Sequence, residues 1–201
     1  GHFTDSQLVG FLAGDPVLKH TSEKTATRLG SLKLLAEDVS HEKFDLFREC
    51  RGTYCAVVYE PEKKKLSLIT DKIGVRPVYF WIQPNFIVFA SALRILEALR
   101  CYQREIDLKG ISEITCFGYP LSDRTPYKDI FSLYAGEVAS FEATKIERKK
   151  YWDWSALPLK KIENTVFAKQ LHEIFIESIK IRLKKQKSVA AFLSGGLDSR
   201  A

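Results

Sequence analysis

Residues 53–90, TYCAVVYEPEKKKLSLITDKIGVRPVYFWIQPNFIVFA, contain four short runs rich in β-branched and aromatic side chains. The runs are Thr53–Glu60, Leu66–Thr70, Val78–Ile82 and Asn85–Ala90. Side chains of these types favour strands, and the breaks at Glu60–Lys63 and Gln83–Asn85 have the length and residues of hairpin turns. The stretch therefore predicts neighbouring strands of an antiparallel sheet. Within it, Asp71, Gly74 and Pro77 are typical of a structural turn before a strand.

Further elements are predicted before this sheet. Gln7–Ala13 is an apolar run that ends at a Gly-Asp-Pro sequence, which indicates a strand followed by a turn. Apolar residues then recur at helical spacing in Leu29–Val39 and in Phe44–Cys50. We expect Ser40 to cap the second of these helices, because a serine hydroxyl can accept from the first free N–H groups of a helix.

After the sheet, the sequence predicts helices at Ala92–Cys101 and Leu108–Cys116 and a strand at Glu137–Glu142. The segment Glu147–Leu159 shows neither a helical nor a strand period, so we interpret it as part of a linker.

The last forty residues have a different pattern. Asn164 is expected to cap a helix whose apolar residues recur every four positions from Phe167 to Leu183. Ser188–Leu193 is a short continuous apolar run, as in a strand buried on both faces of a parallel sheet.

A glycine-rich loop follows directly, Ser194-Gly195-Gly196-Leu197-Asp198-Ser199. Its glycines lack the side chains that would block phosphate oxygens, its serines offer hydroxyl donors, and an oncoming helix would add positive charge. A carboxylate beside a polyphosphate requires a cation between them, so the loop aspartate is a candidate magnesium ligand. An ordinary turn from strand to helix is the alternative interpretation.

Composition narrows the classes of function. The 201 residues are 45% apolar, and no apolar run approaches the roughly 20 residues of a membrane helix. The net charge of +6 comes from scattered lysine clusters without interleaved aromatics, which indicates solvated faces rather than a nucleic-acid surface. The four cysteines lack the spacing of a zinc or redox motif and are expected to be free thiols in a reducing compartment.

The terminal loop resembles the Ser-Gly-Gly-x-Asp-Ser signature of the N-type ATP pyrophosphatases, and Phe192–Ser199 is especially similar to asparagine synthetases and the related β-lactam synthetases. Further matches to that family lie upstream, in the same order as in the family. They are Arg51–Tyr59, Thr70–Tyr79, Phe89–Ser91, Gly118–Pro120, Thr125–Tyr127 and Leu133–Glu137. The resemblance covers roughly residues 50–201.

This resemblance implies an α+β fold with an Ntn-hydrolase-like antiparallel sandwich, followed by the start of an α/β adenine-nucleotide α-hydrolase-like domain. We expect a glutaminase-like domain at residues 1–145 that is N-terminally incomplete, a linker at 146–162, and a truncated ATP-pyrophosphatase synthetase domain at 163–201.

The implied reaction uses ATP and Mg²⁺ to activate a carboxylic acid such as aspartate as an adenylate. An amine or ammonia donor then forms the amide, as in asparagine biosynthesis in the cytoplasm. The resemblance also implies the remainder of the synthetase domain as a partner and is compatible with a homodimer. Magnesium would lie at Asp198. The residues that would hold the ATP pyrophosphate are Leu193, Ser194, Gly195, Gly196, Leu197, Asp198 and Ser199.

Glutamine-using members of this family begin with a cysteine whose α-amino group acts as its own base. This chain begins with Gly1-His2, so no complete catalytic set is expected. The family's Asn-Gly-Glu-Ile-Tyr-Asn segment falls at Ala13–Leu18, where the amide donor is replaced. One alternative is therefore a non-catalytic scaffold domain, as in β-lactam synthetases. Another is a tRNA-modifying ATP pyrophosphatase, although such enzymes do not carry a β-rich domain of this pattern before the loop.

Overall fold

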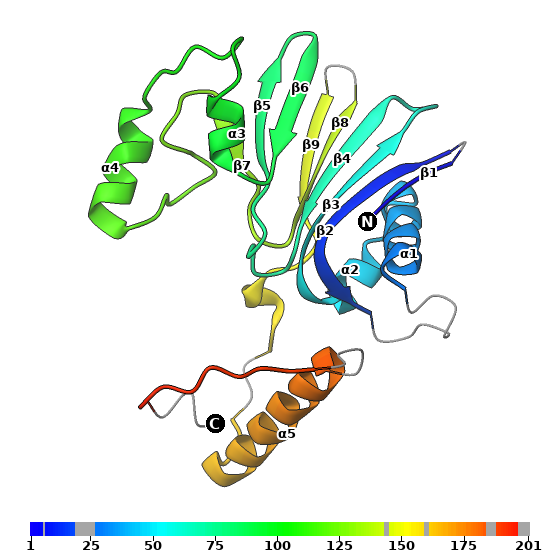
Figure 1. Ribbon diagram of the computed structural model, residues 1–201, viewed down its shortest axis with the longest axis vertical. Helices are drawn as coiled ribbons and strands as arrows, with labels where there is room; N and C mark the ends of the chain where they lie inside the picture. The colour runs from blue at the N-terminus through cyan, green and yellow to red at the C-terminus, as the bar shows by residue number, and fades with distance from the viewer. Residues whose placement is uncertain (6, 19–26, 143–144, 159–160, 184–187, 197–201) are drawn as a thin grey trace. The chain divides into compact units, whose positions relative to one another are not determined.

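The computed structural model describes residues 1–5, 7–18, 27–142, 145–158, 161–183 and 188–196 (Figure 1). The chain divides into two compact units, Gly1–Leu157 (unit 1) and Pro158–Ala201 (unit 2). Unit 1 contains two antiparallel sheets, and the described part of unit 2 contains one long helix.

Unit 1 is built on a six-stranded sheet, sheet A, with the strand order β1-β2-β3-β4-β8-β9. These strands are β1 (His2–Thr4), β2 (Val9–Val17), β3 (Arg51–Glu60), β4 (Lys65–Thr70), β8 (Glu137–Glu142) and β9 (Lys145–Lys150). The strand predicted at Gln7–Ala13 is confirmed, but the Gly-Asp-Pro sequence after it is not a turn. These residues stay paired with β3, so the strand continues to Val17.

The second sheet, sheet B, has three strands in the order β6-β5-β7. They are β5 (Tyr79–Gln83), β6 (Phe86–Ala90) and β7 (Ile130–Ser132). Both hairpins predicted from residues 53–90 are confirmed, β3 with β4 and β5 with β6. They lie in different sheets, however, because the connection from Asp71 to Val78 carries the chain from sheet A to sheet B. Apolar and polar side chains alternate along a strand in the same way in either sheet. The sequence pattern therefore does not show which sheet a strand joins.

One face of sheet A is covered by α1 (Arg28–Ser40) and α2 (Asp45–Glu49). Leu32 of α1 and Phe47 of α2 are fully buried there with Tyr54 of β3. Ser40 does not cap α2 as predicted. It ends α1 instead, where its hydroxyl donates to the Glu37 carbonyl at 2.9 Å.

The other face of sheet A packs on sheet B. Phe80 of β5 meets Phe141 of β8 edge-to-face with ring centroids 5.6 Å apart, and Leu68 of β4 is fully buried in the same cluster. Behind sheet B, α3 (Leu93–Glu97) buries Leu96 against Trp81. The layers are therefore helix, sheet, sheet, helix, which confirms the predicted α+β antiparallel sandwich (Figure 1).

A further helix, α4 (Leu108–Phe117), lies between α3 and β7 in the chain and agrees with the prediction to one residue. The Asp107 carboxylate caps it by accepting the N–H groups of Lys109 at 2.9 Å and Gly110 at 3.3 Å. This arrangement stabilises the start of a helix that presents much apolar surface.

The predicted linker at 146–162 begins too early. Lys145–Lys150 forms β9, which pairs with β8 at six positions, and η1 (Trp154–Ala156) is a short 3₁₀ helix. The strand escapes pattern analysis because β9 is an edge strand with mostly charged side chains, so it shows no apolar alternation.

In unit 2, α5 (Asn164–Leu183) confirms the predicted helix, with Asn164 as its first residue rather than its cap. The Phe167 N–H donates to the Glu163 carbonyl at 2.9 Å. The first carbonyl that accepts a helical hydrogen bond is therefore that of Glu163, one residue before Asn164. The strand predicted at Ser188–Leu193 is wrong for this structure. Among the described residues it pairs with no strand, and an apolar run cannot form a buried strand without neighbours to supply ladder hydrogen bonds.

Candidate functional site

The loop that follows β4 is organised around Asp71, whose side chain is completely buried. One carboxylate oxygen accepts the backbone N–H groups of Ile73 at 3.0 Å and Val75 at 3.2 Å. The other accepts those of Arg76 at 3.1 Å and Tyr54 at 3.2 Å. Four donors around one carboxylate fix the backbone between the two sheets, so the predicted structural role of this acidic residue is confirmed.

Two glycines bring β2 and β3 unusually close. Gly14 has φ +93° and Gly52 has φ +96°. A Cβ on Gly14 would lie 2.2 Å from the Thr53 carbonyl oxygen, and a Cβ on Gly52 would lie 2.2 Å from the Asp15 carbonyl oxygen. Only glycine fits either position. The glycine of the Arg51–Tyr59 motif is therefore required by the pairing of this strand with the Ala13–Leu18 segment.

A cavity of about 300 Å³ opens between the sheets at the middle of β2 and β3. It is lined by β1, β2 and β3 of sheet A and by β6 of sheet B. Most of its walls are apolar, including Phe11, Val57, Val78 and Phe89. The polar side chains among its described lining are those of His2, Cys55 and Ser91.

The Cys55 thiol on the cavity wall is nearly buried. Burial raises the pKa of this thiol, and the nearby Arg76 charge opposes that change only in part. Because the thiolate is the nucleophilic form, a raised pKa keeps Cys55 unreactive at neutral pH. The cavity residues described here thus supply an apolar pocket rather than an activated nucleophile.

The terminal loop is described as far as Gly196; Leu197, Asp198 and Ser199 lie outside the described residues. The Gly196 N–H donates to the Ser194 hydroxyl at 3.2 Å, and Leu193 is exposed. A Cβ on Gly195 would meet no atom of the described residues within 4 Å. Neither loop glycine is among those with positive φ. Neither packing nor backbone conformation in the described structure therefore demands glycine at Gly195.

The described ranges show neither a metal-binding cluster nor a membrane-spanning helix. No group of three or more His, Cys, Asp or Glu side chains in them could hold a metal ion. None of the helices described is both long and apolar enough to cross a membrane. The four cysteines are free, with Cys50 and Cys55 buried and Cys101 and Cys116 exposed.

Most of the sandwich and its buried aspartate loop lie in a region that known proteins share. Residues 35–152 match the glutamine amidotransferase domain family, and the chain belongs to that family. This match covers more than half of the chain and runs from α1 to the residues after β9.

Curated relatives specify the kind of protein that carries such a domain. The chain is 28% identical over 78% of its length to the Methanocaldococcus jannaschii protein named "Putative asparagine synthetase (glutamine-hydrolyzing) 2". It is 25% identical over 78% of its length to glutamine-hydrolysing asparagine synthetase 3 of Bacillus subtilis. These matches cover 31% and 26% of the two relatives, so the chain spans a third or less of their length. The asparagine-synthetase-like character predicted from the sequence is therefore confirmed for this region.

A solved structure, the glutamine phosphoribosylpyrophosphate amidotransferase of B. subtilis with ADP and GMP, aligns with 76% of this chain and 31% of its own. Its TM-score is 0.42 and its sequence identity is 12%.

The cavity is not predicted by the sequence, although two of its lining residues lie in motifs quoted above. Cys55 lies in the motif Arg51–Tyr59, and Ser91 ends the motif Phe89–Ser91. Ser91 lies just past the end of β6, and alternation along β3 places Cys55 on the face of its strand opposite to that of Tyr54. Alternation cannot show that two strands from different sheets face one another, because that depends on the path of the Asp71 loop.

Proposed function

We propose that this chain is part of an ATP-dependent, AMP-forming synthetase that makes an amide from a carboxylic acid such as aspartate. Unit 1 would be its amidotransferase-type domain, and residues 163–201 would begin its ATP-pyrophosphatase domain. The observation that carries this proposal is the order of two features in one chain. A glutamine amidotransferase domain at 35–152 precedes a Ser-Gly-Gly-Leu-Asp-Ser loop at 194–199.

In this reaction the substrate carboxylate attacks the α-phosphorus of ATP, and the bond to the β-phosphate breaks, which gives an acyl-adenylate and pyrophosphate. An amine or ammonia then attacks the acyl carbon, and AMP leaves with the electron pair of the broken bond. Backbone N–H groups and hydroxyls of Ser194–Ser199 would stabilise the leaving pyrophosphate. Glycine at position 195 supports this role, because no atom of the described residues lies within 4 Å of the place that a Cβ would take, and an anion could occupy that space.

Magnesium fits the chemistry of this loop. The Asp198 carboxylate is a hard oxygen ligand of the kind that Mg²⁺ takes together with phosphate oxygens. When bound, the ion would neutralise charge on the departing pyrophosphate. The loop itself orients that group through its own donors.

A second candidate function is that unit 1 is a scaffold that no longer hydrolyses glutamine. Two observations favour it. The Asn-Gly-Glu segment of glutamine-using relatives is replaced by Ala13-Gly14-Asp15, and the described cavity walls carry no charged side chain to hold the α-ammonium and α-carboxylate of glutamine. Ammonia or another amine would then be the nitrogen donor.

The product assay with the full-length protein tests the main proposal. ATP, Mg²⁺, aspartate and ammonium should give AMP and pyrophosphate, and Asp198→Asn should abolish both. Asp45→Asn is the matched control, because that carboxylate forms only an exposed ion pair with Arg48. Formation of ADP and phosphate would contradict the proposal. Ammonia release from glutamine would contradict the scaffold alternative.

A further inference from the structure

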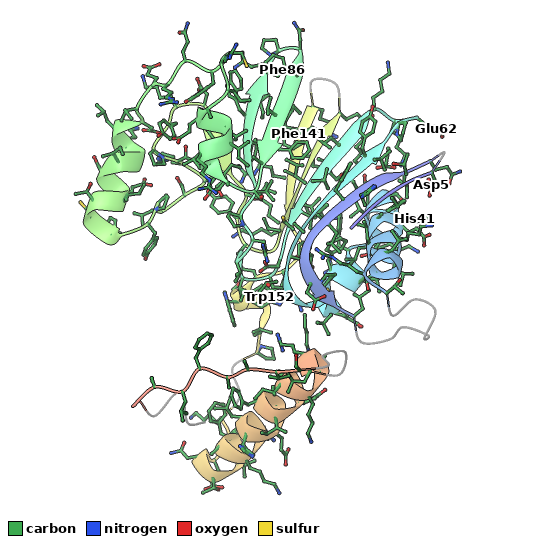
Figure 2. All side chains as sticks on the ribbon, viewed as in Figure 1. Asp5, His41, Glu62, Phe86, Phe141 and Trp152 are labelled. Carbon is green, nitrogen blue, oxygen red and sulfur yellow. The ribbon has the colours of Figure 1, made fainter. Side chains whose placement is uncertain are left out.

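We draw no further inference here: the strongest candidate, the apolar cavity that β1, β2 and β3 of sheet A form with β6, the strand that begins at Phe86 (Figure 2), belongs to the site already described, and nothing in the structure shows what covers its open side.

Discussion

Asp71 and Tyr54 are joined by two hydrogen bonds that tie the end of β4 to β3, and a third bond lies beside them. The Asp71 N–H donates to the Tyr54 carbonyl at 3.0 Å and the Asp71 side chain accepts the Tyr54 N–H at 3.2 Å, while the Tyr151 hydroxyl, beside Tyr54, donates to the Thr70 carbonyl at 2.6 Å. From this point the chain leaves sheet A for sheet B. The relative position of the two sheets, and thus the cavity between them, depends on this contact.

Asp71→Asn should destabilise unit 1 by about 2–4 kcal/mol. The asparagine amide keeps one oxygen acceptor, but its NH₂ group replaces the other carboxylate oxygen. Two backbone N–H groups that now donate to that oxygen would then face another donor. Urea unfolding monitored by tryptophan fluorescence measures the change. Asp45→Asn, at an exposed carboxylate, should change the free energy of unfolding by less than about 1 kcal/mol. Equal effects of the two variants would contradict the role given to Asp71.

Arg148→Met should cost about 3 kcal/mol. Arg148 Nε lies 2.7 Å from Glu137 Oε1 and Arg148 Nη2 lies 2.8 Å from Glu137 Oε2, and Glu137 is only 3% exposed. Removing the guanidinium leaves a buried carboxylate without its cation. Lys150→Met, at an exposed pair with Asp153, is the control and should cost under about 1 kcal/mol. If Glu137→Gln in the Arg148→Met background restores no stability, the loss does not come from the unpaired charge.

Cys50 should make unit 1 sensitive to alkaline pH. Burial raises the pKa of its thiol to about 11, whereas an unfolded cysteine titrates near about 8.5. Between these values the unfolded chain releases a proton that the folded chain retains, so stability is fully present below the unfolded pKa and falls as pH rises. We expect Cys50→Ala to reduce the loss of unfolding free energy between pH 8 and 10 by about 2 kcal/mol relative to the unsubstituted chain. Cys101→Ser, at an exposed thiol, should leave the slope unchanged.

Gly14→Ala should lower the stability of the fold, whereas Gly195→Ala should leave stability unchanged and lower ATP cleavage. At Gly14 the added methyl group would meet the Thr53 carbonyl oxygen at 2.2 Å with φ at +93°, so we expect at least about 2 kcal/mol of destabilisation. At Gly195 the methyl group meets no atom of the described residues within 4 Å, so we expect thermal unfolding to be unchanged. In the full-length protein, Gly195→Ala should nonetheless lose most ATP cleavage, because the methyl group would obstruct the pyrophosphate. Full activity of Gly195→Ala would contradict the loop's proposed role.

Local patterns predict the elements of unit 1 well where one face of a strand or helix is buried. β8 agrees with its expected bounds, and β3 begins two residues before its prediction. The sequence does not predict β9, because the charged side chains of this edge strand hide the apolar alternation of a strand. It also does not predict that the two hairpins lie in different sheets, because that depends on the buried Asp71 carboxylate. Ser188–Leu193 has the composition of a buried strand, but composition does not supply the neighbouring strands that a ladder needs.

The terminal loop remains a prediction, since half of it lies outside the described residues. The role of its glycines in leaving room for phosphate stays a prediction as well.

The most direct measurement of the proposed synthetase follows nitrogen and phosphate together. The full-length protein would be incubated with ATP, Mg²⁺ and aspartate, with either ¹⁵N-ammonium or amide-¹⁵N-glutamine, and its products identified by mass spectrometry and ³¹P NMR. We predict AMP, pyrophosphate and one ¹⁵N-labelled amide in equal amounts from at least one nitrogen source. Cleavage of ATP to ADP and phosphate, or formation of AMP without any labelled amide from aspartate or other carboxylic acids, would contradict the account.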